Sequence, residues 1–293
     1  KPITVLNTVT GLSAASAKPF LVTFSGGIAI NSMSFTTKTD FTTASQPRSV
    51  ASADLDGDGK PELIATNNGS LSVSLLRNTS SSGTLAFATK VDLTTGAGPS
   101  SVAAGDLDGD GKLDLAIGNQ FSNTVSILRN TSTGGMLSLA AKIDSAVGSG
   151  PLGVAIGDLD GDGKPDLALA NFSSSTVSVL RNTSTVGSIS FARKVDFITG
   201  TNSRPYNIGL GDIDGDGKLD LVAPNAFASN VSVIRNTSTP GNLSFAGRVD
   251  FTTGDTPSGV AIGDLDGDGK PDIAISNLFS TSVSVFRNTS KVD

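Results

Sequence analysis

Short runs in which apolar and polar residues alternate recur along most of the chain, with turn-forming residues between them. In residues 153–198 these runs read GVAIGDLD, DLALAN, TVSVLRN and SISFARKVDF. Alternation with a period of two is typical of half-buried β-strands, and clusters of Gly, Ser, Asn and Asp mark turns. The pattern therefore predicts four short strands joined in sequence, an antiparallel four-stranded meander.

The same pattern returns at a nearly constant spacing. Each copy contains DLDGDGK, or DIDGDGK in the fourth, and the copies start at Asp54, Asp106, Asp158, Asp212 and Asp264, which are 52, 52, 54 and 52 residues apart. A unit of this size cannot bury a core alone and must pack on its neighbours. Radial packing of four-stranded sheets makes a β-propeller. We therefore predict an all-β fold, a propeller with five such repeats and room for a degenerate sixth.

The acidic residues are concentrated in the five repeated loops. Each loop holds four acids, so together they contain 20 of the 27 Asp and Glu residues. In the third copy the carboxylates at positions one, three, five and nine can converge on one ion, and the backbone carbonyl of Lys164 at position seven can join them. Oxygen-only ligands in a flexible turn favour calcium over magnesium or zinc. Five divalent ions would change the formal net charge from −6 to +4.

We expect five structural calcium sites, with ligands of the same type in each copy. The predicted ligands are Asp54, Asp56, Asp58, Lys60 and Glu62; Asp106, Asp108, Asp110, Lys112 and Asp114; Asp158, Asp160, Asp162, Lys164 and Asp166; Asp212, Asp214, Asp216, Lys218 and Asp220; and Asp264, Asp266, Asp268, Lys270 and Asp272. The loop begins like an EF-hand, but Leu169 stands where the twelfth-position Glu would be, and the flanks are strand-like. Plain Asp-Gly turns are the alternative. Four uncompensated acids in nine residues would repel one another, which favours the calcium interpretation.

The composition argues against several other functions. Cys, His and Trp are absent, which excludes disulfides, thiolate or imidazole metal sites, and Ser–His or Cys–His nucleophiles. Four of the seven acids outside the loops recur once per repeat, two residues after Lys or Arg, as strand residues would: Asp92, Asp144, Asp196 and Asp250. There is no basic cluster interleaved with aromatics and no apolar run near the roughly 18 residues of a membrane span. We expect neither an enzyme nor a nucleic-acid-binding or membrane-spanning protein.

The loop GDLDGDGKPDLALAN and the strand TVSVLRN that follows it resemble the FG-GAP or VCBS-type repeat, as in the calcium-binding propeller of integrin α subunits. The resemblance covers residues 34–293. It implies a propeller whose calcium loops join the first and second strands of each blade on one face. Members of that broad group include adhesion receptors, fungal sugar-binding lectins and accessory domains of secreted bacterial enzymes. The near-identity of the five repeats is most similar to the bacterial secreted members.

The two ends of the chain suggest how the ring closes. The last repeat ends at RNTSKVD without a fourth strand, and residues 33–41 match the missing strand. We therefore expect an N-terminal strand to complete the last blade. Residues 34–293 would form the propeller, and residues 1–33 either a degenerate blade without calcium or an extension. Within them, ITVLNTVTG resembles the third strand, and LVTFSGGIAINS suggests a hairpin. The chain begins with Lys and no signal peptide, which suggests a processed or trimmed protein.

The face opposite the calcium loops offers candidate binding residues. Its second-to-third turns carry four aromatics, Phe121, Phe172, Phe227 and Phe279, for which packing between blades is the favoured interpretation. The loop 200–206 has a two-residue insertion and the only tyrosine, Tyr206, so it is the favoured place for a specific contact. Arg48 and Arg204 lie on this face and could meet an acidic ligand. The Asn-Thr-Ser turns on the calcium side are formal glycosylation sequons or plain turns.

Two functions remain open. The first is an extracellular or cell-surface binding and adhesion module for a carbohydrate or an extracellular protein, with several sites giving avidity. The second is a structural subunit of an extracellular fibre or surface assembly, formed by strand exchange through the N-terminus. The family resemblance favours the binding module.

Overall fold

The computed structural model describes residues 4–6, 13–15 and 34–290, and it divides the chain into two units, residues 1–40 and 41–293. In the first unit β1 (Thr4–Leu6) pairs antiparallel with β2 (Ser13–Ala15). The expected hairpin of residues 21–32 lies outside the described residues.

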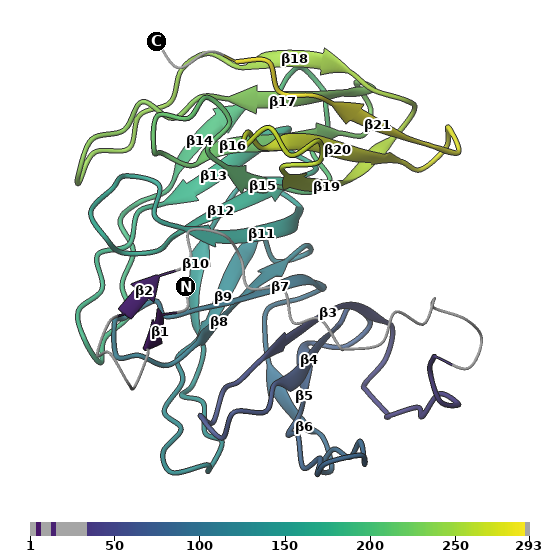
Figure 1. Cartoon of the computed structure of the whole chain (residues 1–293), viewed down its shortest axis with the longest axis vertical. Coiled ribbons are helices and arrows are strands. Elements are labelled where there is room, and N and C mark those ends of the chain that lie inside the picture. Colours follow the sequence, from purple (N-terminus) through teal and green to yellow (C-terminus); the bar gives the residue numbers. More distant parts are fainter. Residues whose placement is uncertain (1–3, 7–12, 16–33, 291–293) are drawn as a thin grey trace. The chain divides into compact units, whose positions relative to one another are not determined.

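The second unit contains five antiparallel sheets, here called blades 1 to 5, which follow one another in chain order (Figure 1). Blade 1 has β3 (Pro47–Ala53), β4 (Glu62–Asn67), β5 (Ser72–Leu76) and β6 (Val91–Thr94). Blade 2 has β7 (Pro99–Gly105), β8 (Asp114–Asn119), β9 (Thr124–Leu128) and β10 (Ile143–Ala146). Blade 3 has β11 (Pro151–Gly157), β12 (Asp166–Asn171), β13 (Thr176–Leu180) and β14 (Val195–Ile198). Blade 4 has β15 (Gly209–Gly211), β16 (Asp220–Asn225), β17 (Asn230–Ile234) and β18 (Val249–Thr252). Blade 5 has β19 (Pro257–Gly263), β20 (Asp272–Asn277) and β21 (Ser282–Phe286).

Strands pair in chain order within every blade, so the predicted meander is confirmed, and no helix occurs in the described residues. The fourth strand is shorter than expected: in blade 3 it covers only Val195–Ile198 rather than residues 188–197. The reason is a tight turn in which the amides of Thr185 and Ser188 donate to each other's carbonyls at 3.0 and 2.8 Å. This turn folds the start of the expected fourth strand back toward the segment that follows β13. Only an isolated β-bridge, between Asn182 and Phe191, forms there.

The hydrophobic core lies between blades. Between blades 3 and 4, Leu159, Val177 and Val179 of one sheet meet Leu221 and Ile234 of the next, all nearly inaccessible to water. Equivalent clusters join blades 1 and 2, 2 and 3, and 4 and 5. Because each sheet buries its faces only against its neighbours, the repeats stabilise one another, as expected for a propeller.

Blade 5 has one apolar face that is exposed among the residues that the structure describes. Val283 is 62% exposed, although the matched residues of blades 1 to 4 (Val73, Val125, Val177 and Val231) are all 0% exposed. Leu265 and Val285 of this face are similarly exposed, at 61% and 58%. Blade 5 therefore carries the apolar residues of an inner blade, but no further blade buries them within the described residues.

The expected closing strand is not seen in this structure. Blade 5 has three strands, and no strand occurs in residues 34–46. The ring of Phe41 packs edge-on against Phe87, with centroids 5.0 Å apart, and the amide of Ala44 donates to Ser74 Oγ at 3.1 Å. Phe197 makes the same contact with Phe245 in the next blade, at 4.8 Å. Residues 41–44 thus lie against blade 1 as the end of a preceding blade would, and ring closure stays a prediction.

Candidate metal centres and the opposite face

The acidic loops join the first and second strands of each blade, as the resemblance implied. In blade 3 the loop runs from β11 to β12, and the carboxylate of Asp158 accepts the amides of Gly161 and Gly163 at 2.7 and 2.9 Å. Gly163 has a φ of +85°, which a residue with a side chain rarely adopts. The same bonds recur in all five loops, so DGDGK folds into one turn that draws its carboxylates together.

Three carboxylates gather in every loop, with one oxygen from each lying within 4.8 Å of the others. In blades 2 to 5 they are the acids at positions one, three and nine, and in blade 1 those at positions one, three and five. The groups are Asp54, Asp56 and Asp58; Asp106, Asp108 and Asp114; Asp158, Asp160 and Asp166; Asp212, Asp214 and Asp220; and Asp264, Asp266 and Asp272. Glu62, which the sequence placed among the ligands, does not belong to the blade 1 group. These clusters could hold metal ions.

The ninth-position acid also ties the loop to the rest of its blade. Both oxygens of Asp166 accept amides, from Leu159 at 2.9 Å and from Asn182 at 2.7 Å. Burial raises the pKa of Asp166 to about 6, against the pull of these two hydrogen bonds, and the pKa values of Asp114 and Asp220 are raised to about 6 for the same reason. A cation beside such a carboxylate would offset the cost of its buried charge.

Arginines that the sequence reading missed lie beside the clusters. Arg77 Nε donates to Asp56 Oδ2 at 2.6 Å, and Arg129 Nε donates to Asp108 at 2.5 Å. Blades 4 and 5 have the same pair, Arg235 with Asp214 and Arg287 with Asp266. An arginine precedes every Asn-Thr-Ser turn in the sequence, and this recurrence could have identified these residues as partners of the acidic loops.

In blade 3 no arginine among the described residues donates a hydrogen bond to the third-position acid, Asp160. The surroundings of this acid therefore show whether a cation would fit the site. Asp160 is buried, and its Oδ2 has no hydrogen-bond partner in the part of the chain that the structure describes. Burial raises the pKa of Asp160. A buried carboxylate oxygen without a donor is costly, and hard cations take such oxygens as ligands. The oxygen-rich donor set therefore suits a hard divalent cation.

Asparagines of the Asn-Thr-Ser turns connect neighbouring blades. The buried Asn182 donates its Nδ2 to Leu107 O in the blade 2 loop and to Pro165 O in its own loop, both at 2.8 Å. Its Oδ1 accepts the Ser184 amide at 2.8 Å. Asn130, Asn236 and Asn288 reach the preceding loop in the same way. These amides are therefore structural in the folded protein, a role beyond the turn predicted for them.

The remaining predicted ligands stay predictions. The fifth-position acids Asp110, Asp162, Asp216 and Asp268 lie in the loops but outside the groups of three. Each accepts the amide of the lysine that follows two residues later, at 2.9–3.0 Å. The lysine carbonyls are untested as ligands. Lys164 Nζ donates to Ser184 O at 2.8 Å, so its side chain binds the neighbouring turn.

A family model described as FG-GAP-like repeat matches five segments of the chain: residues 18–65, 54–117, 107–169, 158–223 and 225–275. The first four segments overlap at the acidic loops, the fifth begins two residues after the fourth ends, and together they cover most of the sequence. The chain belongs to the FG-GAP-like repeat family. The first match begins before residue 34, so the repeat pattern extends into the segment that precedes blade 1.

Solved structures similar to this FG-GAP protein are propellers at low identity. A lectin from Agrocybe aegerita that recognises non-reducing terminal N-acetylglucosamine is 22% identical, with a TM-score of 0.56 over 83% of this chain and 63% of the lectin. A protein from Desulfotomaculum acetoxidans is 18% identical, with a TM-score of 0.57 over 85% of this chain and 71% of that one. Virginiamycin B lyase from Staphylococcus aureus is 11% identical, with a TM-score of 0.51 over 84% and 71%. At these identities the likeness shows the fold alone. No curated protein matches the sequence.

The face opposite the acidic loops of this FG-GAP propeller carries exposed aromatics. Phe121, Phe227 and Phe279 are 64%, 60% and 73% exposed. The expectation that these rings pack between blades is wrong for Phe121 and Phe279, whereas Phe227, although exposed, contacts the neighbouring blade. The reason is that their turns project beyond the sheets. Phe172 is half-buried and touches Phe227 and Tyr206 edge-on, with each pair of centroids 5.9 Å apart.

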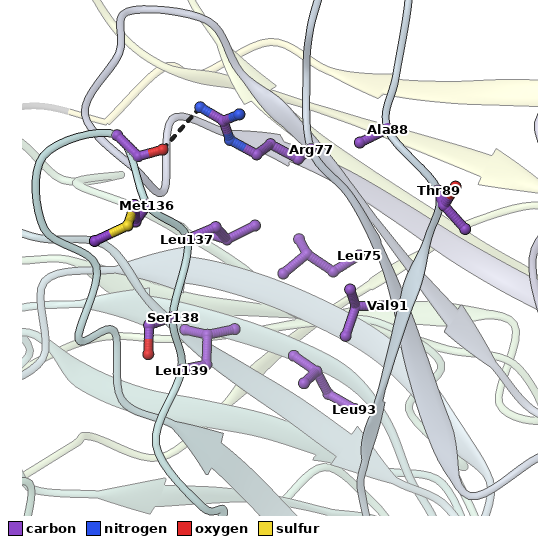
Figure 2. Close-up of a pocket in the computed structure, with 11 residues that line it drawn as sticks. Leu75, Arg77, Ala88, Thr89, Val91, Leu93, Met136, Leu137, Ser138 and Leu139 are labelled. Carbon is purple, nitrogen blue, oxygen red and sulfur yellow. Dashed lines mark hydrogen bonds between the residues drawn. The ribbon is translucent and has the colours of Figure 1, made fainter.

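A separate pocket of about 330 Å³ lies between blades 1 and 2, and Figure 2 shows its lining. Its walls are mainly aliphatic, with Leu75, Val91 and Leu93 from blade 1 facing Leu137 and Leu139 of blade 2. At its edge Arg77 Nη2 donates to Gly135 O at 2.7 Å. A ligand site usually adds several convergent polar groups to such a wall. We interpret this pocket as a gap in the packing between two outer strands.

No helix in the described residues is long and apolar enough to cross a membrane.

Proposed function

We propose that this FG-GAP protein is an extracellular, calcium-stabilised binding or adhesion module whose ligand is a carbohydrate or a surface protein. The observation that carries the proposal is the recurrence of a carboxylate cluster in the same connection of every blade. Five matched cation sites at one end of the blades serve the scaffold, which leaves the opposite end, with its exposed aromatics, for a ligand. The lectin among the structural neighbours is compatible with this division.

Calcium is the proposed ion in all five sites. The ligands would be the aspartates of each loop, Glu62 in blade 1, and the lysine carbonyl at position seven. Bound calcium would neutralise carboxylates that otherwise repel one another. Extracellular calcium modules bind with dissociation constants of roughly 10⁻⁴ to 10⁻³ M, so sites of this kind fill outside cells rather than in the cytosol. This is the basis of the proposed extracellular or cell-surface location.

A non-enzymatic role is the better proposal for the acids outside the loops. Asp144 accepts a hydrogen bond from Ser126 Oγ at 2.6 Å and forms an ion pair with Lys142. Asp92 and Asp196 interact with the serine and the lysine at the matched positions of their own blades. A repeated structural contact is a poor candidate for a unique catalytic group. Some structural neighbours are lyases, but FG-GAP repeats are not enzymatic on their own.

The test is binding to immobilised ligands. The purified protein is applied to an array of glycans and extracellular matrix proteins, in calcium and in excess chelator. The proposal predicts selective binding in calcium that is lost in chelator and restored when calcium is returned. Absence of binding to every glycan and protein on the array, with the protein folded, would contradict it.

A structural subunit is the second candidate, favoured by the uncovered face of blade 5. Leu265, Val283 and Val285 expose the surface that inner blades bury against the next repeat. In this candidate the N-terminal segment of a second copy would add to blade 5, and a head-to-tail exchange of this type does not close. Light scattering in calcium, with and without residues 1–33, tests this candidate. Filaments that vanish on deletion would favour assembly, whereas monomers that keep their ligand affinity would favour the binding module.

A further inference from the structure

A cavity of about 380 Å³ opens at the meeting point of the five blades. Residues from the first-strand segments of all five blades line it, on the face opposite the acidic loops. The hydrogen bond from Arg48 of blade 1 to the Tyr206 hydroxyl of blade 4, at 3.4 Å, crosses this space. The cavity is therefore a single central site, unlike the five repeated metal centres.

The repeats differ most in chemistry where they line this cavity. The residue after the first proline of each first-strand segment lines the cavity in all five blades, and it is of four different kinds: Arg48, Ser100, Leu152, Tyr206 and Ser258. The acidic loops of the same blades are nearly identical. Near-identical blades thus present one cationic, two hydroxyl, one aliphatic and one aromatic side chain to a common space. Variation at these positions changes which ligand the cavity can bind and leaves the fold of the blades as it is.

Among the described residues that line the cavity, Arg48 is the one charged residue and none is an acid. Its Nη1 donates to Gln120 Oε1 at 2.8 Å, and its Nη2 to the Tyr206 hydroxyl. These bonds use two of the five N–H donors of a guanidinium, so donors remain for a carboxylate. Gln120 and Tyr206 are both neutral, which leaves the positive charge of Arg48 unpaired at these contacts.

The other lining groups suit a hydroxylated ligand. Tyr206 is held edge-on against Phe172, whose ring also meets the Arg204 guanidinium at 5.4 Å, and this support limits the movement of the tyrosine. Ser258 and Ser276 also line the cavity, and their hydroxyl oxygens lie 3.3 Å apart. Asn207 uses its Oδ1 to accept the Ile208 amide at 2.9 Å. Serine hydroxyls, an amide and an aromatic ring therefore surround the cation.

We propose that the central cavity binds a sugar that carries a carboxylate, such as a uronic acid. Arg48 would pair with the carboxylate, the serine hydroxyls and Asn207 would bind ring hydroxyls, and Tyr206 would pack against the apolar face of the ring. The inference rests on the proposed binding module and names the class of its ligand.

Methyl β-D-glucuronide and methyl β-D-glucoside test this site, because they differ only in whether C6 is a carboxylate. Binding is measured by calorimetry in calcium for the wild type, Arg48→Gln and Tyr206→Ala. Arg193→Gln is the control, since it removes an exposed guanidinium that does not line the cavity. A hydrogen bond to a charged group is worth roughly 1.5–3 kcal/mol, so Arg48→Gln should weaken glucuronide binding at least about tenfold. The control should bind as the wild type does, and Tyr206→Ala should weaken both sugars.

The outcomes separate this inference from the proposed function. Glucuronide binding that Arg48→Gln leaves unchanged would place the carboxylate elsewhere, for example on loop calcium, and would overturn the central site. Equal affinity for glucuronide and glucoside would overturn the role of Arg48. If the array detects another ligand while neither sugar binds, the binding module stands and this inference fails. If neither the array nor the sugars give binding, both fail.

Discussion

At the scale of single residues, the asparagines of the Asn-Thr-Ser turns join neighbouring blades. Asn182 is completely buried, and its carboxamide bridges the acidic loops of blades 2 and 3. Removing a buried donor leaves its former acceptors without a partner, and that loss costs more than the hydrogen bond itself contributes. The amide is thus coupled to the geometry of two candidate metal centres at once.

We therefore expect Asn182→Ala to lower the free energy of unfolding by about 1–3 kcal/mol, because one buried and one partly buried carbonyl lose their donor. Urea denaturation in calcium measures the change. Asn242→Ala is the matched control, since Asn242 is exposed and also stands in a sequon; a surface change of this kind stays within about 0.5 kcal/mol. Equal stability of the two variants would show that the bridge contributes nothing.

The three ninth-position aspartates with raised pKa values predict how the calcium-free protein responds to pH. Asp114, Asp166 and Asp220 have pKa values of about 6 in the folded chain, against 3.8 as the ordinary value. The folded state therefore binds these protons more tightly than the unfolded state does, so their contribution to stability is lost as pH rises from about 3.8 through about 6. Calcium-free protein should resist urea better at pH 4.5 than at pH 7. A urea midpoint that rises over this interval would contradict the assignment.

At the scale of elements, one position of the third strand separates an inner blade from an end blade. Val177 in β13 is fully buried between blades 3 and 4, whereas Val283 occupies the matched position of β21 and is 62% exposed. The two valines stand in closely similar segments, TVSVLRN and SVSVFRN, and the main difference between their positions is whether another blade follows. This makes them a direct probe of whether the face of blade 5 is covered in solution.

We expect Val177→Asp to destabilise the protein by several kcal/mol, because it buries an unpaired carboxylate. Val283→Asp should change the unfolding free energy by no more than about 0.5 kcal/mol. Thermal or urea denaturation of both variants measures the difference. Similar destabilisation of both would show that blade 5 is covered, by residues 1–33 or by a second copy, and loss of oligomers in Val283→Asp would identify the second copy.

The strands and the acidic loops could be predicted from the sequence because local patterns determine them. Alternation located the strands, and the DGDGK spacing located the carboxylate clusters of all five blades. The short fourth strand was missed because a local turn between Thr185 and Ser188 competes with the longer strand. The bridges made by Asn182 and the exposure of Phe279 depend on contacts between segments far apart in the chain, which one sequence does not reveal.

At the scale of the whole molecule, stability depends on neighbours and on counter-ions together. Each blade buries its apolar faces only against adjacent blades, and each acidic loop carries four acids. At about 1 mM free calcium, a site with a dissociation constant of roughly 10⁻⁴ to 10⁻³ M contributes on the order of 0.4 to 1.4 kcal/mol. Five sites would supply roughly 2 to 7 kcal/mol, comparable with the stability of a typical domain.

The most direct test of the account is thermal unfolding with calcium removed and then returned. Elemental analysis of the dialysed protein should find about five calcium ions per chain, and circular dichroism should show a large fall in Tm after chelation that added calcium reverses. Magnesium at the same concentration is the control and should restore little. An unchanged Tm after elemental analysis has verified complete removal would contradict the claim that calcium in the five loops stabilises the propeller.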